Sequence, residues 1–180
     1  EGMDIDGLGI KIIEQLVDKG LIKNIADIYT LTVDDVASLK KNGKKFAQNV
    51  IDAINQSKQN ELFKLITALG IRHIGVKSAK GLTKKFKTID EIANADLETL
   101  SNIDDVGEIT AKSIYEFFRQ EQTIDLIQRL KDAGVNTKVL EDKSAGYDQR
   151  FEGKTFVLTG SLENYTRDQA GEIIENFGGK

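Results

Sequence analysis

The sequence predicts an all-α domain followed by a short piece of an α/β domain, and three observations support this prediction. First, one pattern occurs four times: an apolar residue, a glycine four positions later, Ala or Ile after four more, and an aliphatic residue after three more. Second, apolar residues recur at helical spacing up to about residue 134, and the chain has no proline. Third, the residues after 150 change to a strand–turn–helix pattern.

The four repeats have an almost constant spacing. Their glycines are Gly9, Gly43, Gly75 and Gly107, which lie 34, 32 and 32 residues apart. A period of this length predicts stacked supersecondary units, each with a tight turn that leads into a helix. The small or aliphatic residue four positions after each glycine lets two helices cross closely. We therefore expect four tandem helical hairpins over residues 1–137, paired as first with second and third with fourth in two pseudo-twofold pairs.

Apolar stripes and capping residues mark the helices of this domain. One stripe consists of Ile10, Ile13, Leu16 and Val17. Helix starts are predicted where Thr precedes an acidic or amide residue by three positions, as in a capping box. These pairs are Thr32 with Asp35, Thr88 with Glu91 and Thr166 with Gln169.

The chain changes character beyond the helical domain. Residues 138–150 are polar and aperiodic, which predicts a linker. Residues 154–159 have the pattern of a buried strand, and residues 167–177 have that of a helix. A single strand and helix cannot bury both faces of a sheet, so residues 151–180 are predicted to be the truncated start of an α/β domain.

Charge is unevenly distributed. The chain carries a net charge of −4, yet residues 36–87 contain 12 Lys or Arg against two acidic residues. A basic block between acidic flanks is a candidate footprint for a polyanion, although a solvated lysine-rich face is an equally good interpretation of charge alone. The chain has no Cys, which excludes disulfides and thiolate metal sites, and no run that approaches a membrane span. We expect a monomeric, soluble piece of a longer intracellular protein with no membrane contact.

The first repeat carries the clearest chemistry. Gly7, Leu8 and Gly9 form a tight turn that leads directly into a helix, and Leu8 is predicted to anchor the turn in the core. The first N–H groups of a helix have no partner within it, and the helix dipole adds partial positive charge there. Such a start binds an anion without a charged side chain.

The four units resemble helix-hairpin-helix motifs, a family of modules that hold the DNA backbone across the minor groove. Four in tandem, followed by residues 153–163, resemble the C-terminal part of the bacterial NAD-dependent DNA ligase family with the start of its BRCT domain. Residues 3–9 and 68–75 also resemble local runs of that family. The resemblance covers essentially the whole chain.

The resemblance implies a division of labour. The parent ligase would use NAD, Mg and Zn through an adenylation domain, an OB domain and a four-cysteine zinc module, none of which this chain contains. We therefore expect no cofactor, metal site or ligation activity in the chain itself. It is expected to hold nicked duplex DNA in replication and repair, with the rest of the ligase as its partner in cis, in the bacterial cytoplasm at the nucleoid.

Candidate DNA-binding residues lie at the four turns and the helix starts that follow them. They are Gly7, Gly9, Lys11, Gly43, Lys44, Lys45, Arg72, His73, Gly75, Lys77, Gly107 and Thr110. A phosphate-binding turn of the BRCT type is predicted at Thr159 and Gly160. No catalytic or metal-ligating residue is predicted.

The turns are not equal in sequence. The second has Lys41 and Asn42 before its glycine in place of a glycine and an apolar residue, and Lys44 and Lys45 compensate with charge. In the fourth turn, acidic Asp104 and Asp105 are expected to repel DNA, and the third is the best candidate for a phosphate site. Two alternatives stay open: another repair or recombination protein, such as a nuclease subunit or junction binder, and a protein-interaction scaffold without affinity for duplex DNA.

Overall fold

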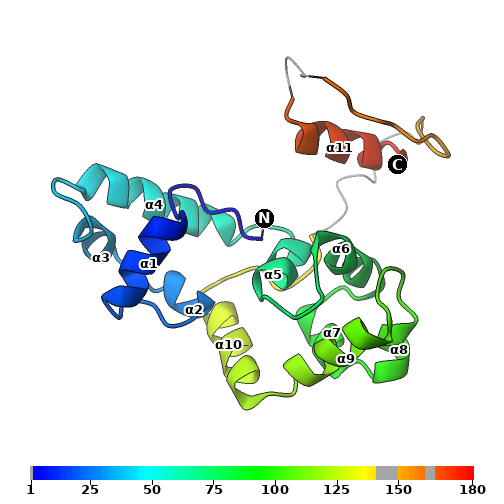
Figure 1. The fold of residues 1–180 in the computed structure, drawn as a ribbon, viewed down its shortest axis with the longest axis horizontal. Coiled ribbons are helices and arrows are strands. Elements are labelled where there is room, and N and C mark those ends of the chain that lie inside the picture. The colour runs from blue at the N-terminus through cyan, green and yellow to red at the C-terminus, as the bar shows by residue number, and fades with distance from the viewer. Residues whose placement is uncertain (1, 141–149, 161–164) are drawn as a thin grey trace. The chain divides into compact units, whose positions relative to one another are not determined.

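The computed structural model describes residues 2–140, 150–160 and 165–180. The chain divides into two compact units, Glu1–Leu140 and Glu141–Lys180 (Figure 1), and each is described by itself. The predicted linker, residues 138–150, lies mostly outside the described residues. None of the helices in the described ranges is long and apolar enough to cross a membrane.

The first unit is built from helices joined by short turns, which confirms its predicted helical character. The helices are α1 (Ile10–Asp18), α2 (Ile25–Ile28), α3 (Val33–Ala37), α4 (Lys44–Ser57), α5 (Leu62–Ala68), α6 (Val76–Lys85), α7 (Ile89–Asn94), α8 (Leu97–Ser101), α9 (Glu108–Phe117) and α10 (Glu121–Asp132).

Several helices begin where the sequence provides a cap. Thr32 and Asp35 form the predicted capping box at α3, because each side chain accepts a hydrogen bond from the other's backbone N–H. At α7, Thr88 accepts from the N–H of Glu91, but the Glu91 carboxylate accepts from Lys87 and not from Thr88. The predicted box at α7 is therefore only half formed.

Three helix pairs build the hairpins: α3 packs against α4, α5 against α6, and α8 against α9. In each pair, the alanine four residues after the repeat glycine is fully buried. These residues are Ala47, Ala79 and Ala111. The small side chain at this position lets the two helices approach closely, as the sequence predicted.

The first repeat departs from this pattern. Of the predicted apolar stripe, Leu16 is fully buried, but Ile10 is 78% exposed and Val17 is 52% exposed. Ile10 is the first residue of α1, and the residues at the same position of α6 and α4, Val76 and Lys44, are exposed as well. The predicted stripe is therefore only partly buried.

Two clusters of buried apolar side chains form the core of the first unit. The smaller cluster consists of Val36, Ala47, Val50 and Ile54, from α3 and α4. The larger cluster extends over α5–α10 and also takes in Met3 and Ala26 from the N-terminal part of the chain.

The second unit contains α11 (Arg167–Asn176), which begins at the capping box predicted for Thr166. Residues 154–159 form no strand, contrary to the sequence prediction. A strand exists through hydrogen bonds to its neighbours, and here the N–H of Lys180 donates to the Lys154 carbonyl at 2.9 Å while the N–H of Phe156 donates to the Lys180 carbonyl at 2.6 Å. These two bonds have the arrangement of a parallel pair, but they join residues 154–156 to a single residue.

Three partly exposed aromatic rings pack together in the second unit. The ring of Phe151 lies 4.8 Å from that of Phe156 and 5.6 Å from that of Phe177, measured between centroids. Edge-on contacts of this kind bury apolar surface where no complete sheet covers it.

Candidate nucleic-acid interface

Three of the four turns share one backbone geometry. In each, an isoleucine carbonyl accepts a hydrogen bond from the N–H of the apolar residue three positions later. The residue directly before that apolar residue adopts a left-handed conformation. The hydrogen bonds run from Leu8 to Ile5 at 3.2 Å, from Ile74 to Ile71 at 3.0 Å and from Val106 to Ile103 at 3.0 Å. The left-handed residues are Gly7 (φ 79°), His73 (φ 66°) and Asp105 (φ 64°). Each turn therefore delivers the chain into the next helix in the same way.

The helices after these turns, α1, α6 and α9, begin at Gly9, Gly75 and Gly107. All three glycines are extended caps with ψ of 170°, −176° and 173°, and no side chain caps the helix. The first N–H groups of these helices therefore face outward with the positive end of the helix dipole behind them. This arrangement is suited to an anion such as a phosphate.

No contact within the described part of the chain requires glycine at these three caps. A Cβ added at Gly9, Gly75 or Gly107 would meet no atom within 4 Å, and φ is negative at all three. Thr, Ser, Asp or Asn would cap a helix at least as well. The absence of a side chain leaves open space directly in front of the helix N–H groups.

The second turn differs from the other three. Its hydrogen bond forms one residue later, from the N–H of Gly43 to the Lys40 carbonyl at 3.1 Å, and Asn42 is its left-handed residue. Gly43 is buried, and a Cβ there would lie 2.8 Å from the Ala37 carbonyl oxygen and 2.9 Å from that of Lys40. Gly43, one of the predicted DNA-binding residues, is therefore required by packing within the hairpin.

Exposed basic side chains accompany the turns. Lys11 follows the first turn, Arg72 lies in the third, and Lys44 and Lys45 open α4 after the second. The ammonium group of Lys40 lies 3.7 Å from the centre of the Phe46 ring, which holds another positive charge beside the second turn.

The third and fourth turns are joined by an ion pair between Lys77 and Asp105. The Lys77 Nζ lies 2.6 Å from the Asp105 Oδ1, and this hydrogen bond together with the carboxylate charge raises the pKa of Lys77. The sequence predicted that Asp105 would repel DNA, but its charge is compensated by a neighbouring lysine. That lysine is itself a predicted DNA contact.

The backbone of the fourth turn also rests on α6. The Ser78 hydroxyl donates to the Asp105 carbonyl at 2.9 Å, and a Cβ at Gly81 would lie 2.7 Å from the Asp104 carbonyl oxygen. The first turn lies against α4 in a comparable way, because a Cβ at Gly7 would lie 2.9 Å from the Val50 Cγ2. Glycine is therefore needed at Gly81 and Gly7 for close packing between hairpins.

The other predicted residues lie in two places. His73 is exposed at the third turn, and Thr110 is half-buried on α9. Thr159 and Gly160 lie in the second unit, where both are exposed and the Arg167 Nη2 donates to the Gly160 carbonyl at 3.1 Å. The structure thus divides the candidate residues between the hairpin turns and a separate turn of the second unit.

Three exposed apolar residues at the turns were not predicted as site residues: Ile10, Ile109 and Val76, which follows Gly75 and is 36% exposed. Ile10 is 78% exposed and Ile109 is 72% exposed, and they lie one and two residues after a cap glycine. Their position in the repeat could have revealed them, since the first residue of the helix lies at the tip of the hairpin. In the second repeat this position is occupied by Lys44.

The class of protein follows from this geometry together with family comparisons. Residues 3–56 match a family model described as a SAM-like helix-hairpin-helix tandem, and residues 64–127 match the helix-hairpin-helix motif. Residues 146–180 match the BRCA1 C-terminus (BRCT) domain. The chain thus combines tandem helix-hairpin-helix motifs with a BRCT segment.

The particular resemblance is to DNA ligases, as the sequence predicted. The chain is 48% identical over its whole length to a DNA ligase of Acetivibrio thermocellus, 46% to one of Thermoanaerobacter pseudethanolicus and 42% to one of Clostridioides difficile. It spans 27% of the length of each of these relatives.

Proposed function

We propose that this chain binds duplex DNA through the sugar-phosphate backbone, without sequence specificity, as the DNA-holding region of a DNA ligase. The observation that carries this proposal is the set of three uncapped helix starts at Gly9, Gly75 and Gly107, each with open space where a side chain would stand. The lack of a Cβ allows an anion to approach the helix N–H groups closely. Contacts to phosphate position a protein on DNA but carry no sequence information.

The four turns, with the helices that follow them, are proposed to act as two pairs. In the first pair, the first turn packs on α4, and the Lys19 ammonium donates to the Ser38 carbonyl at 3.0 Å, which ties α1 to the end of α3. In the second pair, the fourth turn packs on α6 through Ser78 and Gly81. Each pair would present its turns to one stretch of backbone.

Lysines would add the electrostatic part of the affinity. Lys11, Lys44, Lys45 and Arg72 are exposed beside the turns, and none of them has an acidic partner among the ion pairs of the described residues. If the chain neutralises about six phosphates, the logarithm of the affinity falls against the logarithm of the salt concentration with a slope near −5.

The wider role is proposed from the ligase relatives. The chain would hold nicked duplex while an adenylation domain elsewhere in the protein seals the break with NAD, and Mg and Zn would belong to those other domains. The described residues contain no cluster of three or more His, Asp or Glu suited to a metal ion. The turn at Thr159 and Gly160 is proposed as a secondary phosphate contact of the BRCT segment.

One observation favours a second function. Exposed Ile10 and Ile109 lie at the tips of two hairpins, where a protein-interaction scaffold would present apolar side chains to a partner. Such a scaffold would show no affinity for duplex DNA.

A titration with nicked duplex at two salt concentrations distinguishes these functions. We expect binding to nicked duplexes of unrelated sequence with equal affinity and a steep salt dependence. Binding that changes little with salt would contradict the phosphate contacts, and no binding at low salt would favour the scaffold.

A further inference from the structure

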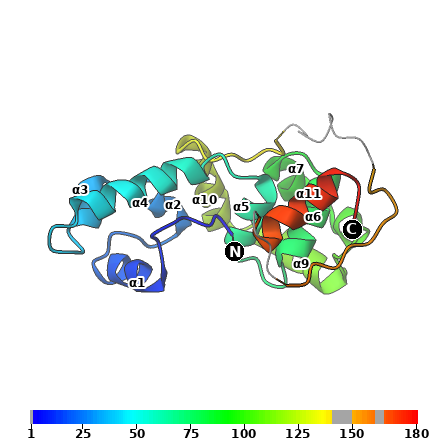
Figure 2. The same ribbon diagram turned by 90° about the horizontal axis from the view of Figure 1, so that it is seen from above.

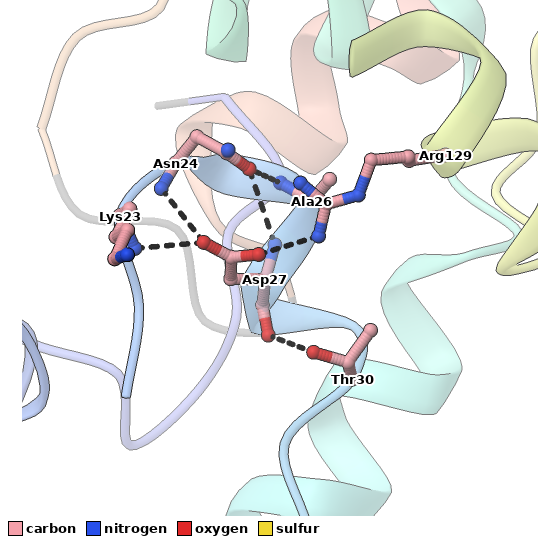
Figure 3. Close-up of polar contacts among 6 residues, drawn as sticks. All are labelled: Lys23, Asn24, Ala26, Asp27, Thr30 and Arg129. Atoms are coloured by element: carbon pink, nitrogen blue, oxygen red, sulfur yellow. Dashed lines mark hydrogen bonds and ion pairs between the residues drawn. The ribbon is translucent and has the colours of Figure 1, made fainter. Parts of the chain in front are cut away.

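An ion pair joins the beginning and the end of the helical unit. The Arg129 Nη2 on α10 donates to the Asp27 Oδ1 on α2 at 2.5 Å (Figure 3). These residues are 102 positions apart in the sequence. In Figure 1 and Figure 2, α10 lies beside α2, and the two helices contact each other.

Local backbone hydrogen bonds orient the carboxylate of Asp27, independently of Arg129. Its second oxygen accepts hydrogen bonds from the N–H groups of Lys23 at 2.7 Å and Asn24 at 3.1 Å. The Asn24 side chain accepts in return from the N–H groups of Ala26 and Asp27, which completes a capping box (Figure 3). The hydrogen bond from Arg129 lowers the pKa of Asp27, with help from the two N–H groups, so the carboxylate stays charged.

This ion pair links the N-terminal and C-terminal parts of the helical unit. Asp27 lies between the first hairpin and the second, whereas α10 follows the fourth hairpin. The side chain of Asp27 is 17% exposed and that of Arg129 is 36% exposed, so the pair is partly shielded from solvent. Charged hydrogen bonds to an oriented carboxylate fix geometry more strictly than apolar contacts do.

Hydrogen bonds and apolar contacts also connect the N-terminal part of the chain to the rest of the unit, and Ile5, Ile25 and Tyr29 pack against the larger core. The N–H of Asn136 donates to the Lys58 carbonyl at 2.8 Å, and its side-chain amide donates to the Asn60 carbonyl at 3.0 Å. The Asn60 amide donates in turn to the Met3 carbonyl at 2.7 Å. Apolar support from the N-terminal side comes from Met3 and Ala26 within the larger core.

We propose that the Asp27–Arg129 pair is a latch that fixes the orientation of the two hairpin pairs, so that both can bind one duplex at the same time. This proposal rests on the proposed function. Phosphates on a duplex have fixed positions, and two linked binding sites gain affinity from each other only when their geometry allows simultaneous contact. Arg129 is then a positioning residue for DNA binding and need not touch DNA.

A test of the latch needs a measurement that does not depend on DNA. The chain has no Cys, so spin labels can be attached at two introduced cysteines, Asn49→Cys on α4 and Glu98→Cys on α8, both at exposed positions. We expect a narrow distribution of label-to-label distances in this background and a clearly broader one after Arg129→Met. Arg129→Lys keeps the charge and should restore part of the narrowing.

The matched control is Lys131→Met. Lys131 lies on the same helix and forms an ion pair of similar length, 2.7 Å, with Asp90 of α7, which lies within the second half of the unit. This variant loses the same charge without touching α2. Its distance distribution should equal that of the unsubstituted background, and equal distributions in Arg129→Met and Lys131→Met would overturn the latch.

DNA binding provides the second measurement. Arg129→Met should weaken binding to a long duplex about tenfold relative to Lys131→Met, because one hairpin pair loses simultaneous contact. On a duplex too short for both hairpin pairs, the two variants should bind equally. Equal affinity on the long duplex overturns the latch, whereas an unsubstituted chain that binds no duplex overturns the proposed function and leaves the distance measurement to decide on the latch.

Discussion

The second and third turns each have a glycine at the same position of the repeat, but the two glycines differ in their surroundings. Gly43 is buried, and the carbonyls of Ala37 and Lys40 leave no room for a Cβ. Gly75 is exposed and has no neighbour within 4 Å of an added Cβ. Packing within the hairpin requires the first glycine, whereas no contact among the described residues requires the second.

This difference separates fold from function within a single repeat. A substitution at Gly43 should act on stability first, and a substitution at Gly75 should act on binding first. The effects of the two substitutions on stability and on DNA binding together show whether the open turns bind DNA.

The largest effect is expected for Gly43→Ala. The new Cβ would overlap two backbone carbonyls, which side-chain rearrangement cannot relieve, and overpacking of this kind costs about 1–3 kcal/mol. Urea unfolding followed by circular dichroism measures the loss. An unchanged free energy of unfolding would show that the second turn is not as closely packed as the structure indicates.

The next effect is expected for Gly75→Thr. Thr caps helices about as well as Gly, as it does at α3, α7 and α11 here, so stability should change by less than about 0.5 kcal/mol. The side chain would fill the space in front of the α6 N–H groups, and loss of one charge-assisted contact should weaken duplex binding about tenfold.

Fluorescence anisotropy on several unrelated duplex sequences measures this change. Equal weakening on all of them is expected, since the contact is to backbone. Weakening confined to one sequence, or none at all, would show that α6 does not bind phosphate.

Much of this arrangement could be predicted from the sequence, because it depends on local pattern. The repeat period located the turns, the alanines at the fourth position predicted the close helix crossings, and Thr32 with Asp35 predicted the start of α3. Each of these signals lies within one helix or one turn.

The features that could not be predicted depend on distant parts of the chain or on a shift of one residue. The second turn places its left-handed residue at Asn42, one position later than the glycine spacing implies. The exposure of Ile10 depends on what packs against α1, and periodicity cannot tell a buried apolar stripe from an uncovered one. The pairing of Lys77 with Asp105 and of Asp27 with Arg129 follows from tertiary packing alone.

A smaller effect in the opposite direction is expected for Asp105→Asn. Asn tolerates the left-handed conformation of this position, so the turn should be kept. Removing the carboxylate releases Lys77, and the loss of an exposed ion pair of this strength should raise duplex affinity about threefold.

Asp104→Asn is the matched control for this variant. It removes the same charge from the same turn but leaves the ion pair between Lys77 and Asp105 intact. Equal gains in affinity for the two variants would mean that only net charge matters at the fourth turn.

The smallest effect concerns α3, whose last residue, Ala37, forms part of the packing around Gly43. The Asp35 carboxylate accepts from the Thr32 hydroxyl at 2.6 Å and from the Thr32 N–H at 2.8 Å, and these hydrogen bonds lower the pKa of Asp35. The stabilisation is therefore complete above the unfolded-state pKa, about 3.9, and is lost as the pH falls through the lower folded-state pKa. Asp35→Asn should cost about 0.5 kcal/mol at neutral pH.

Urea unfolding of the unsubstituted chain and Asp35→Asn should converge as the pH is lowered from about 7 to 2, because the protonated carboxyl loses the advantage of its charge. Glu61→Gln is the control, since it removes a carboxylate from the start of a helix, α5, where no side chain caps the backbone. A difference at Asp35 that persists in acid would mean that shape and not charge holds α3. The second turn, which packs against the end of α3, would then be held by packing alone, unlike the open third turn.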